Sequence, residues 1–393
     1  MGSYPDYLTQ DNECSGATNG TIANPFTDSN RLVCFGFGNS TKSASLRLHG
    51  GELEELMENR RLAAKALSDA PLLVGFNLKF DLHWNRRYGL LDNFKGAAWD
   101  TQLAEFILSN QTNPFPSLED TVAKYGLGEK FIDIETEYWN KGIDTDQIPY
   151  DIVKTRGESD IIITSRLFEL QMDELRKNPS KKKLIWVACQ DLLTLQEMEW
   201  NGLKYNLQLS VEEGDKIRKE QTLIRSRLTD LVPYPQINWG SGDHLSAVLY
   251  GGILAYDDKE DFVFVYKDGR TKLKTRNTRF EIELPRRVEP LPKSELAKEG
   301  YFSTSEPTLL KLRPSDKETK EIIRLVQQFN KLDKRVGTYY HGLPKLYEEF
   351  EWTNSTLHGN LNTCATATGR LSSTKPNQQN MDHEIRRCIV SRF

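Results

Sequence analysis

The chain has 393 residues, of which 38% are hydrophobic and 27% are charged, an ordinary composition for a globular protein large enough for two or three domains. It has no apolar run of transmembrane length and no basic-then-apolar signal pattern, so we expect a cytoplasmic protein without a membrane partner. Its five cysteines are scattered and form no CxxC pair, which argues against a disulfide framework or a zinc site.

Charge is distributed unevenly along the chain. The net charge is −4, but residues 263–345 contain 19 Lys/Arg and 11 Asp/Glu, whereas residues 1–262 carry a net charge of −12. An acidic first part joined to a basic second part is typical of a metal-dependent nuclease fused to a segment that holds nucleic acid. Two differently solvated surfaces would give the same distribution.

The first part of the chain alternates short apolar runs with amphipathic stretches. The runs at 31–38 and 71–76 predict buried strands. Residues 51–67 and 101–110 predict helices, and Asp100 is placed to cap the second. This alternation predicts an α/β domain.

The second part begins after a Pro/Lys-rich stretch at 176–183, which we take as the domain boundary. Helical periodicity returns at 184–203, 210–231 and 318–340. Between the last two of these, residues 254–290 alternate apolar and polar side chains around Asp268-Gly269, which predicts a β-hairpin.

Four acidic residues stand out by their spacing to these elements. Asp11 and Glu13 lie two apart on a short strand, so both side chains point to one face. Asn77 and Asp81 are four apart where a buried strand gives way to a helix, which places them on one helical face. Asp160 lies near the start of another helix. Taken singly, Asp81 and Asp160 are equally explained as helix first-turn charges that favour the dipole.

Four ionised carboxylates can share a pocket only when cations neutralise them. Oxygen ligands favour a pair of Mg²⁺ or Mn²⁺ ions, and such a pair activates a water and stabilises the leaving oxygen in phosphodiester cleavage. If the elements converge, the sequence therefore predicts a two-metal nuclease centre.

At these residues the sequence resembles a known family. The segments DNE (11–13), NLKFD (77–81), WDTQLAEFIL (99–108) and SDIIIT (159–164) resemble the motifs of the DEDD 3′–5′ exonucleases, in particular the proofreading domain of family A DNA polymerases. FIDIETEYW (131–139) contains a second Asp-x-Glu triplet, which begins at Asp133. In the family the first motif precedes the segment that contains Asp81, so this later triplet is excluded as the first motif. The resemblance implies an RNase H-like mixed-sheet domain. It also implies catalytic, metal-binding roles for Asp11, Glu13, Asp81 and Asp160, and a DNA contact from Asn77.

One position departs from the family pattern. The tyrosine form of the family has a Tyr four residues before the last Asp, and the histidine form has a His five residues before it. Here Arg156 and Thr155 stand at these positions, and Tyr150 is a candidate replacement. The alternative to an active nuclease is therefore a DNA-binding and assembly module with a degenerate nuclease site.

The second half contains further similar segments. KLDKRVGTYYHGLP (331–344) resembles the thumb helix along the primer-template backbone, which implies a phosphate contact from Lys334; a solvated helix face is the alternative. ATGRLSSTKPNQQN (367–380) resembles the segment that holds the primer-template. It implies that Arg370 reaches the minor groove, and that Asn377 and Gln379 contact the template and the minor-groove edge. As an isolated loop these residues would be turn formers.

From this resemblance we expect three regions. These are a 3′–5′ exonuclease domain at 1–180, a mainly helical thumb and connecting region at 181–345 with a β-rich insertion at about 254–310, and the start of a palm at 346–393.

The expected function is metal-dependent 3′–5′ exonuclease proofreading within a bacteriophage-type family A DNA polymerase. It would act on single-stranded 3′ ends and primer-template DNA in the cytoplasm of an infected bacterium. The segments that would carry the polymerase metal site are not recognisable, so we expect no nucleotide addition by this chain alone. A second polypeptide with the remaining palm and fingers is an expected partner, with truncation as the alternative. The apolar run at 388–393 is then expected to be exposed, with unpaired backbone groups. A less favoured alternative is an RNase D-like RNA exonuclease.

Overall fold

A five-stranded sheet lies at the centre of the first part of the chain. In the computed structural model, which describes residues 4–16, 23–127, 134–265 and 271–391, the strand order is β3-β2-β1-β4-β5. The first three strands pair antiparallel, whereas β4 pairs parallel with β1 and with β5, so the sheet is mixed. The strands are β1 (Leu8–Cys14), β2 (Leu32–Gly38), β3 (Ser43–Arg47), β4 (Leu72–Gly75) and β5 (Ala97–Asp100).

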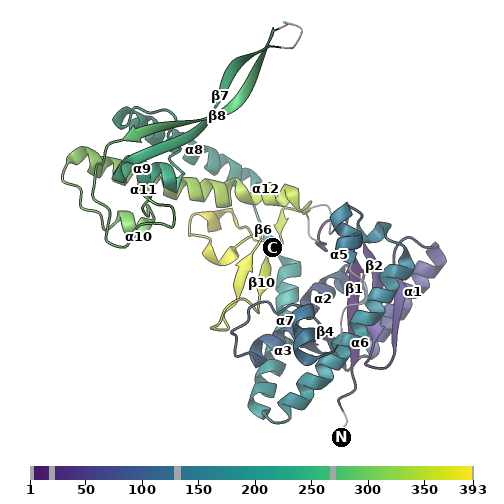
Figure 1. The fold of residues 1–393 in the computed structure, drawn as a ribbon. Helices are drawn as coiled ribbons and strands as arrows, with labels where there is room; N and C mark the ends of the chain where they lie inside the picture. The colour runs from purple at the N-terminus through teal and green to yellow at the C-terminus, as the bar shows by residue number, and fades with distance from the viewer. Residues whose placement is uncertain (1–3, 17–22, 128–133, 266–270, 392–393) are drawn as a thin grey trace. The chain divides into compact units, whose positions relative to one another are not determined.

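Helices cover both faces of this sheet (Figure 1). Successive strand side chains point to opposite faces, and β4 illustrates the consequence. Leu73 packs in a cluster with residues of α1 and α2, whereas Leu72 and Val74 pack with residues of α3, α6 and α7. These helices are α1 (Leu53–Asp69), α2 (Leu78–Arg87), α3 (Thr101–Leu108), α6 (Tyr150–Leu175) and α7 (Pro179–Asn201), and the shorter α4 (Leu118–Tyr125) and α5 (Ile134–Glu137) lie between α3 and α6 in the chain. The expected mixed α/β architecture is confirmed.

The chain divides into two compact units. The first comprises Met1–Asn206 and Lys345–Phe393, and the second comprises Leu207–Pro344. The first unit therefore includes α7 and two small antiparallel pairs. These pairs are β6 (Leu203–Lys204) with β9 (Thr356–Leu357), and β10 (Asn360–Asn362) with β11 (Ser372–Thr374).

The segment from Cys388 to Val390 differs from the expectation of exposed, unpaired backbone. The Val390 N–H donates to Lys204 O at 3.0 Å, and the Asn206 N–H donates to Cys388 O at 2.8 Å. Cys388 is buried. The expectation of unpaired backbone was wrong for these residues because β6 and the residues after it supply the hydrogen-bonding partners, whereas the Val390 side chain is exposed as expected. Residues 392–393 lie outside the described structure.

The second unit combines helices with one long hairpin. Its core is built from apolar side chains of α8, α9 and α11, together with Leu254 and Leu284 at the base of the hairpin. The expected hairpin is present, although its Asp268-Gly269 turn, like Asp133 of the rejected triplet, lies outside the described residues. The elements are α8 (Leu207–Leu231), α9 (Gly242–Tyr250), β7 (Gly252–Val265), β8 (Thr271–Leu284), α10 (Glu306–Leu309), α11 (Lys317–Arg335) and a π-helical turn (Val336–Tyr340), while α12 (Gly342–Glu349) crosses the unit boundary.

Among the helices within the described ranges, none has the length and apolar character needed to cross a membrane.

Candidate metal centre and neighbouring pocket

The strand β1 and the helix α6 together carry an acidic cluster in the first unit. On β1, Asp11 and Glu13 alternate with Asn12, whose side chain points instead towards α2 and donates to Asn85 Oδ1 at 3.0 Å. On α6, Asp160 is buried. One carboxylate oxygen from each of Asp11, Glu13 and Asp160 lies within 4.8 Å of the other two. The structure therefore brings together three of the four predicted acidic residues.

Two glycines let α6 approach the sheet closely enough for this cluster to form. A Cβ atom at Gly36 of β2 would lie 3.2 Å from the backbone oxygen of Asp11, and one at Gly157 of α6 would lie 3.7 Å from Glu13 Cγ. A Cβ atom at Gly36 would also lie 3.4 Å from Ile161 Cγ1 and 3.6 Å from the Gly157 backbone oxygen, so a larger residue there would be crowded by both β1 and α6. The sequence analysis did not identify either glycine as part of the site.

Asp81 lies beside the cluster but is not one of the three residues whose oxygens meet within 4.8 Å. Its carboxylate accepts from the backbone N–H of Asn12 at 2.9 Å, and its side chain is buried. Burial raises the pKa of Asp81 well above its usual value, and the nearby negative charge of Asp11 raises it further. The backbone N–H of Asn12 thus holds the Asp81 carboxylate, the fourth of the set, against β1.

The donor set of the cluster suits a hard divalent cation. Mg²⁺ binds carboxylate oxygens at about 2.1 Å, so ligands on one ion lie roughly 3–4 Å apart. Oxygens of Asp11, Glu13 and Asp160 that all lie within 4.8 Å of one another are compatible with a shared ion. Cysteine and histidine are absent from the group, so the chemistry favours Mg²⁺ or Mn²⁺ over zinc.

Arg156 places a positive charge against this cluster. Its Nε lies 3.1 Å from Glu13 Oε1 and 3.6 Å from Asp160 Oδ2, one turn along α6. The guanidinium also lies over the ring of Trp139, 5.2 Å from the ring centre. The predicted replacement, Tyr150, instead donates its hydroxyl to Ser45 O at 3.2 Å.

Asn77 is oriented differently from the sequence expectation. It is the N-cap of α2 and has a left-handed backbone (φ 57°), so it does not share a helical face with Asp81. Asn and Asp tolerate this conformation better than other non-glycine residues. The N–H groups of Asn77 and Leu78 donate to Asp100 at 3.1 and 3.0 Å. Asp100 also accepts from Gln102 and Leu103, which confirms it as the cap of α3.

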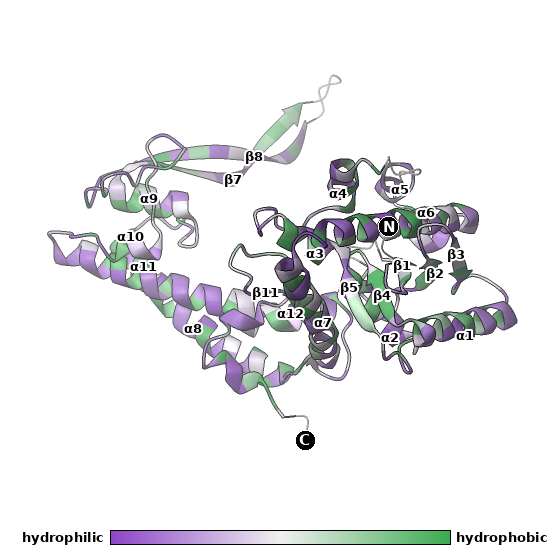
Figure 2. Ribbon diagram, turned by 90° about the horizontal axis from the view of Figure 1, so that it is seen from below, coloured by the Kyte–Doolittle hydropathy of each residue, from purple (hydrophilic) through white to green (hydrophobic). Residues whose placement is uncertain are grey.

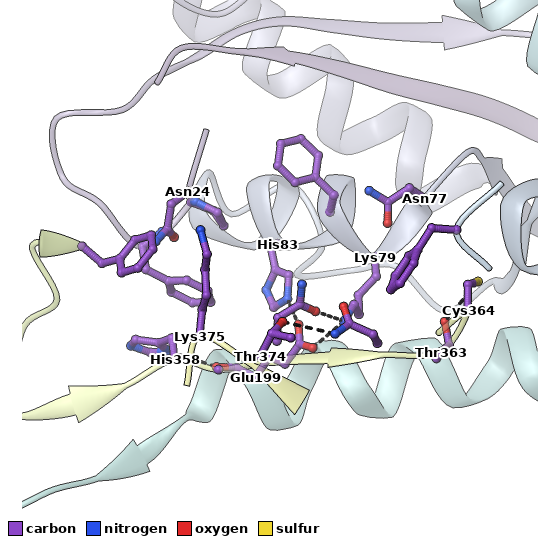
Figure 3. Close-up of a pocket in the computed structure, with 18 of the residues that line it drawn as sticks. Asn24, Asn77, Lys79, His83, Glu199, His358, Thr363, Cys364, Thr374 and Lys375 are labelled. Carbon is purple, nitrogen blue, oxygen red and sulfur yellow. Dashed lines mark hydrogen bonds and ion pairs between the residues drawn. The ribbon is translucent and has the colours of Figure 1, made fainter. Parts of the chain in front are cut away.

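A cavity of about 460 Å³ lies beside α2, between the helical layer and the segment that contains β10 and β11 (Figure 3). Asn77 lies on its wall, and Thr374 and Lys375 reach it from the predicted primer-template segment. Its ring-bearing wall includes Phe26 and His358, whose rings stack with centres 4.0 Å apart. Aromatic rings next to amide groups suit a nucleobase, which has a flat apolar face and a polar edge.

A buried ionic network forms the floor of this cavity. Lys79 donates to Glu199 and also to Asn360 Oδ1 and Leu361 O, at 2.8 and 2.7 Å. His83 Nε2 lies 2.6 Å from Glu199 Oε2. Burial lowers the pKa of both Lys79 and His83, whereas the hydrogen bond from His83 and the charge of Lys79 lower that of Glu199 despite its burial.

This network was not predicted from the sequence. Lys79 and His83 are four residues apart on α2 and so share one helical face, a signal that was available, but no local pattern indicates Glu199 as their partner.

The remaining predicted DNA contacts lie on exposed parts of the two units. Lys334 is exposed on the last turn of α11 in the second unit. In the first unit Arg370, Asn377 and Gln379 are exposed, and two of them also make local hydrogen bonds. Asn377 caps a short turn by accepting from Asn380 N, and Gln379 donates to Leu371 O at 3.1 Å.

Comparison with known proteins finds similarity to DNA polymerases in each case. Residues 280–392 match the model of DNA polymerase family A. DNA polymerase I of Pseudomonas aeruginosa is 24% identical over 325 residues, which cover 81% of this chain and 31% of that protein. DNA polymerase I of Synechocystis sp. is 25% identical over 358 residues, covering 88% and 31%. The chain thus spans about a third of the length of these curated relatives.

A solved structure resembles almost the whole chain. The POL domain of Pol1 from M. smegmatis, in complex with DNA primer-template and dNTP, aligns with a TM-score of 0.63 and 16% identity, covering 97% of this chain and 54% of that one. At this identity the likeness concerns the fold. The chain is therefore related to DNA polymerases I, carries a family A match in residues 280–392, and shares the fold of a polymerase domain.

Proposed function

We propose that this chain is a metal-dependent 3′–5′ exodeoxyribonuclease that proofreads for a bacteriophage-type DNA polymerase. The observation that carries the proposal is the convergence of Asp11, Glu13 and Asp160 within 4.8 Å, with Asp81 beside them. The mixed sheet that presents Asp11 and Glu13 next to α6 is consistent with an RNase H-like exonuclease domain. The relatives named above are DNA polymerases, which favours DNA as the substrate.

In this proposal the carboxylates of Asp11, Glu13 and Asp160 bind the cations, and Asp81 joins them. Two divalent ions, when bound, would supply an activated water and stabilise the leaving 3′ oxygen. Asn12 orients Asp81 through its backbone N–H, and Arg156 limits the repulsion between Glu13 and Asp160.

Each unit, considered by itself, carries proposed DNA contacts. We propose phosphate contact from Lys334 and backbone or minor-groove contact from Arg370, Asn377 and Gln379, with Asn77 next to the departing 3′ nucleotide. These side chains, Asn77 included, are exposed, as contact with a polymer of any sequence requires.

The test is digestion of single-stranded DNA labelled at its 5′ end. With Mg²⁺ we expect products that shorten stepwise from the 3′ end, and none with EDTA. The double variant Asp11→Ala/Glu13→Ala should lose at least a thousandfold in rate, whereas Glu54→Ala/Glu55→Ala, which removes two exposed carboxylates from α1, should not change it. An inactive unmutated protein would contradict the proposal.

One observation favours a second candidate function. Because Arg156 already neutralises part of the cluster, the chain could instead be a DNA-binding module with a degenerate nuclease site. That alternative predicts DNA binding without cleavage at any Mg²⁺ or Mn²⁺ concentration. A labelled RNA strand in the same assay separates both from an RNase D-like enzyme, which would degrade the RNA faster than the DNA.

A further inference from the structure

The β7–β8 hairpin of the second unit is far longer than its packing requires. Fourteen residue pairs connect Gly252–Val265 with Thr271–Leu284, on the order of 45 Å of ribbon. Only Leu254 and Leu284, at its base, are buried. In Figure 1 the ribbon extends away from α9 and α11 of the same unit. A two-stranded ribbon is only marginally stable by itself, so this length does not serve the stability of the unit and indicates a functional role.

The two faces of the ribbon differ in chemistry. Residues directly opposite in an antiparallel pair point to the same face. Phe262 is opposite Lys274, and Phe264 is opposite Lys272, so these four side chains share one face near the far end of the ribbon. We call them the aromatic–basic face. The reverse face carries Val263 opposite Leu273, and nearer the base Asp257 opposite Arg279 and Ala255 opposite Glu281.

The aromatic–basic face is organised around its cations. Lys274 Nζ lies 3.7 Å from the centre of the Phe264 ring, and the Arg276 guanidinium lies 5.2 Å from that of Phe262. Arg276 also pairs with Glu260 at 2.9 Å. Each of these two cations therefore lies against an aromatic ring, a cation–π contact that positions it on this face.

The spacing of these lysines suits the backbone of a DNA duplex. Lys272 and Lys274 are two residues apart on a strand, about 6.8 Å, a separation comparable to the rise of two base steps, about 3.4 Å each, along the axis of a DNA duplex. On the reverse face of this end, Val263 (61%) and Leu273 (65%) are exposed apolar side chains, and Figure 2 shows hydrophobic and hydrophilic residues together at this end of the ribbon.

We propose that the β7–β8 ribbon is a DNA-contacting arm whose aromatic–basic face binds the phosphate backbone of duplex DNA, through Lys272 and Lys274. The assignment does not depend on the carboxylate cluster or on nuclease activity. It adds a non-specific electrostatic contact, which holds any sequence and weakens with salt.

The experiment measures binding of the full chain to a labelled duplex by fluorescence anisotropy, in EDTA, between 50 and 200 mM salt. We expect Lys272→Gln/Lys274→Gln to weaken binding on the order of tenfold, and to reduce the slope of log K against log salt by about 2, since each phosphate contact contributes about 0.9. The matched control is Lys259→Gln/Arg279→Gln, which removes two cations from the reverse face of the same ribbon and should leave the slope unchanged.

If the two double variants lose DNA affinity equally, the loss is an effect of net charge alone, and the proposal is overturned. An unchanged slope in the Lys272/Lys274 variant would also overturn it, and would leave the apolar end to a protein partner. A larger loss on single-stranded than on duplex DNA would overturn the duplex assignment. If the unmutated chain binds no DNA, the proposed function fails as well. If the unmutated chain binds DNA and the Lys272/Lys274 variant binds it equally well, only the ribbon proposal fails.

Discussion

At the scale of single residues, the positive charge of Arg156 lies where it opposes the binding of a metal cation to the neighbouring carboxylates. Its Nε lies 3.1 Å from Glu13, so it competes electrostatically with any divalent ion bound there. We predict that Arg156→Gln, which keeps the length and removes the charge, binds Mn²⁺ about tenfold more tightly by calorimetry.

Without metal, the same variant should be less stable than the unmutated chain, because no positive charge then offsets the repulsion between Glu13 and Asp160. Its melting temperature without metal should fall, and its rise on adding Mn²⁺ should exceed that of the unmutated chain. Lys154→Gln, on the more exposed side of α6, serves as the control with a single lost charge. Equal Mn²⁺ affinity in all three proteins would show that Arg156 does not oppose the metal.

His83 gives a prediction for pH. Gln196 Nε2 lies 3.3 Å from His83 Nδ1 and Nε2 faces Glu199, so the ring fits its neutral form. Its pKa is lowered by burial. A lowered pKa in the folded state means that the unfolded chain binds the proton more readily, so stability is complete above the unfolded pKa of about 6.5 and is lost as pH falls below it.

We therefore predict that, between about pH 6.5 and 5, the unmutated chain loses stability to urea relative to His83→Gln, a comparison in which the opposite effect of Asp100, whose pKa burial raises to about 6, cancels. His83→Gln, which keeps a donor to Glu199, should be less stable at pH 7, and the difference between the two proteins should shrink across that window. Glu199, whose pKa is lowered, loses its contribution only below about pH 4.5, so it does not obscure the comparison. Parallel profiles for the two proteins would assign the acid sensitivity to another group.

At the scale of elements, Asp100 connects two helix starts. Its carboxylate accepts from Asn77 and Leu78 at the start of α2, and from Gln102 and Leu103 at the start of α3. We predict that Asp100→Ala destabilises the first unit by roughly 2–4 kcal/mol, because it leaves buried N–H donors unpaired at both helices. Asp100→Asn should lose less, since one side-chain oxygen remains. Urea denaturation measures both, and a cost below about 0.5 kcal/mol would indicate that water replaces the carboxylate.

The elements also mark where sequence reasoning succeeds. Alternation and capping are local signals, so the strand with Asp11 and Glu13, the helix after Asp100 and the hairpin after Gly252 could all be predicted. The left-handed Asn77 could not, because it depends on Asp100, 23 residues away, accepting the N–H groups at the start of α2. Local periodicity does not show that α6 meets β2 at Gly36 and β1 at Gly157, since these contacts join residues more than 100 positions apart.

At the scale of the whole molecule, the first unit is assembled from two separate stretches of chain. Lys79 on α2 connects them, because it donates both to Glu199 on α7 and to Asn360 and Leu361 beyond the second unit in sequence. Local patterns could not indicate this association, since about 140 residues of another unit intervene.

This organisation predicts that each unit can be destabilised separately. Lys79→Met should leave Glu199 buried with its charge less compensated and cost roughly 3–5 kcal/mol in the first unit. Leu245→Ala, in the core of the second unit, should cost about 2–5 kcal/mol there.

Hydrogen exchange read out by mass spectrometry tests this separation peptide by peptide. In Lys79→Met, faster exchange should appear in β10 and α7 but not in α8, α9 or α11, whereas Leu245→Ala should give the reverse pattern. The double variant should show both changes, each of its single-variant size, because distant and independent sites add. Faster exchange throughout the chain in either single variant would mean that the two units unfold as one, and the buried Lys79–Glu199 contact would then stabilise the whole molecule rather than the first unit alone.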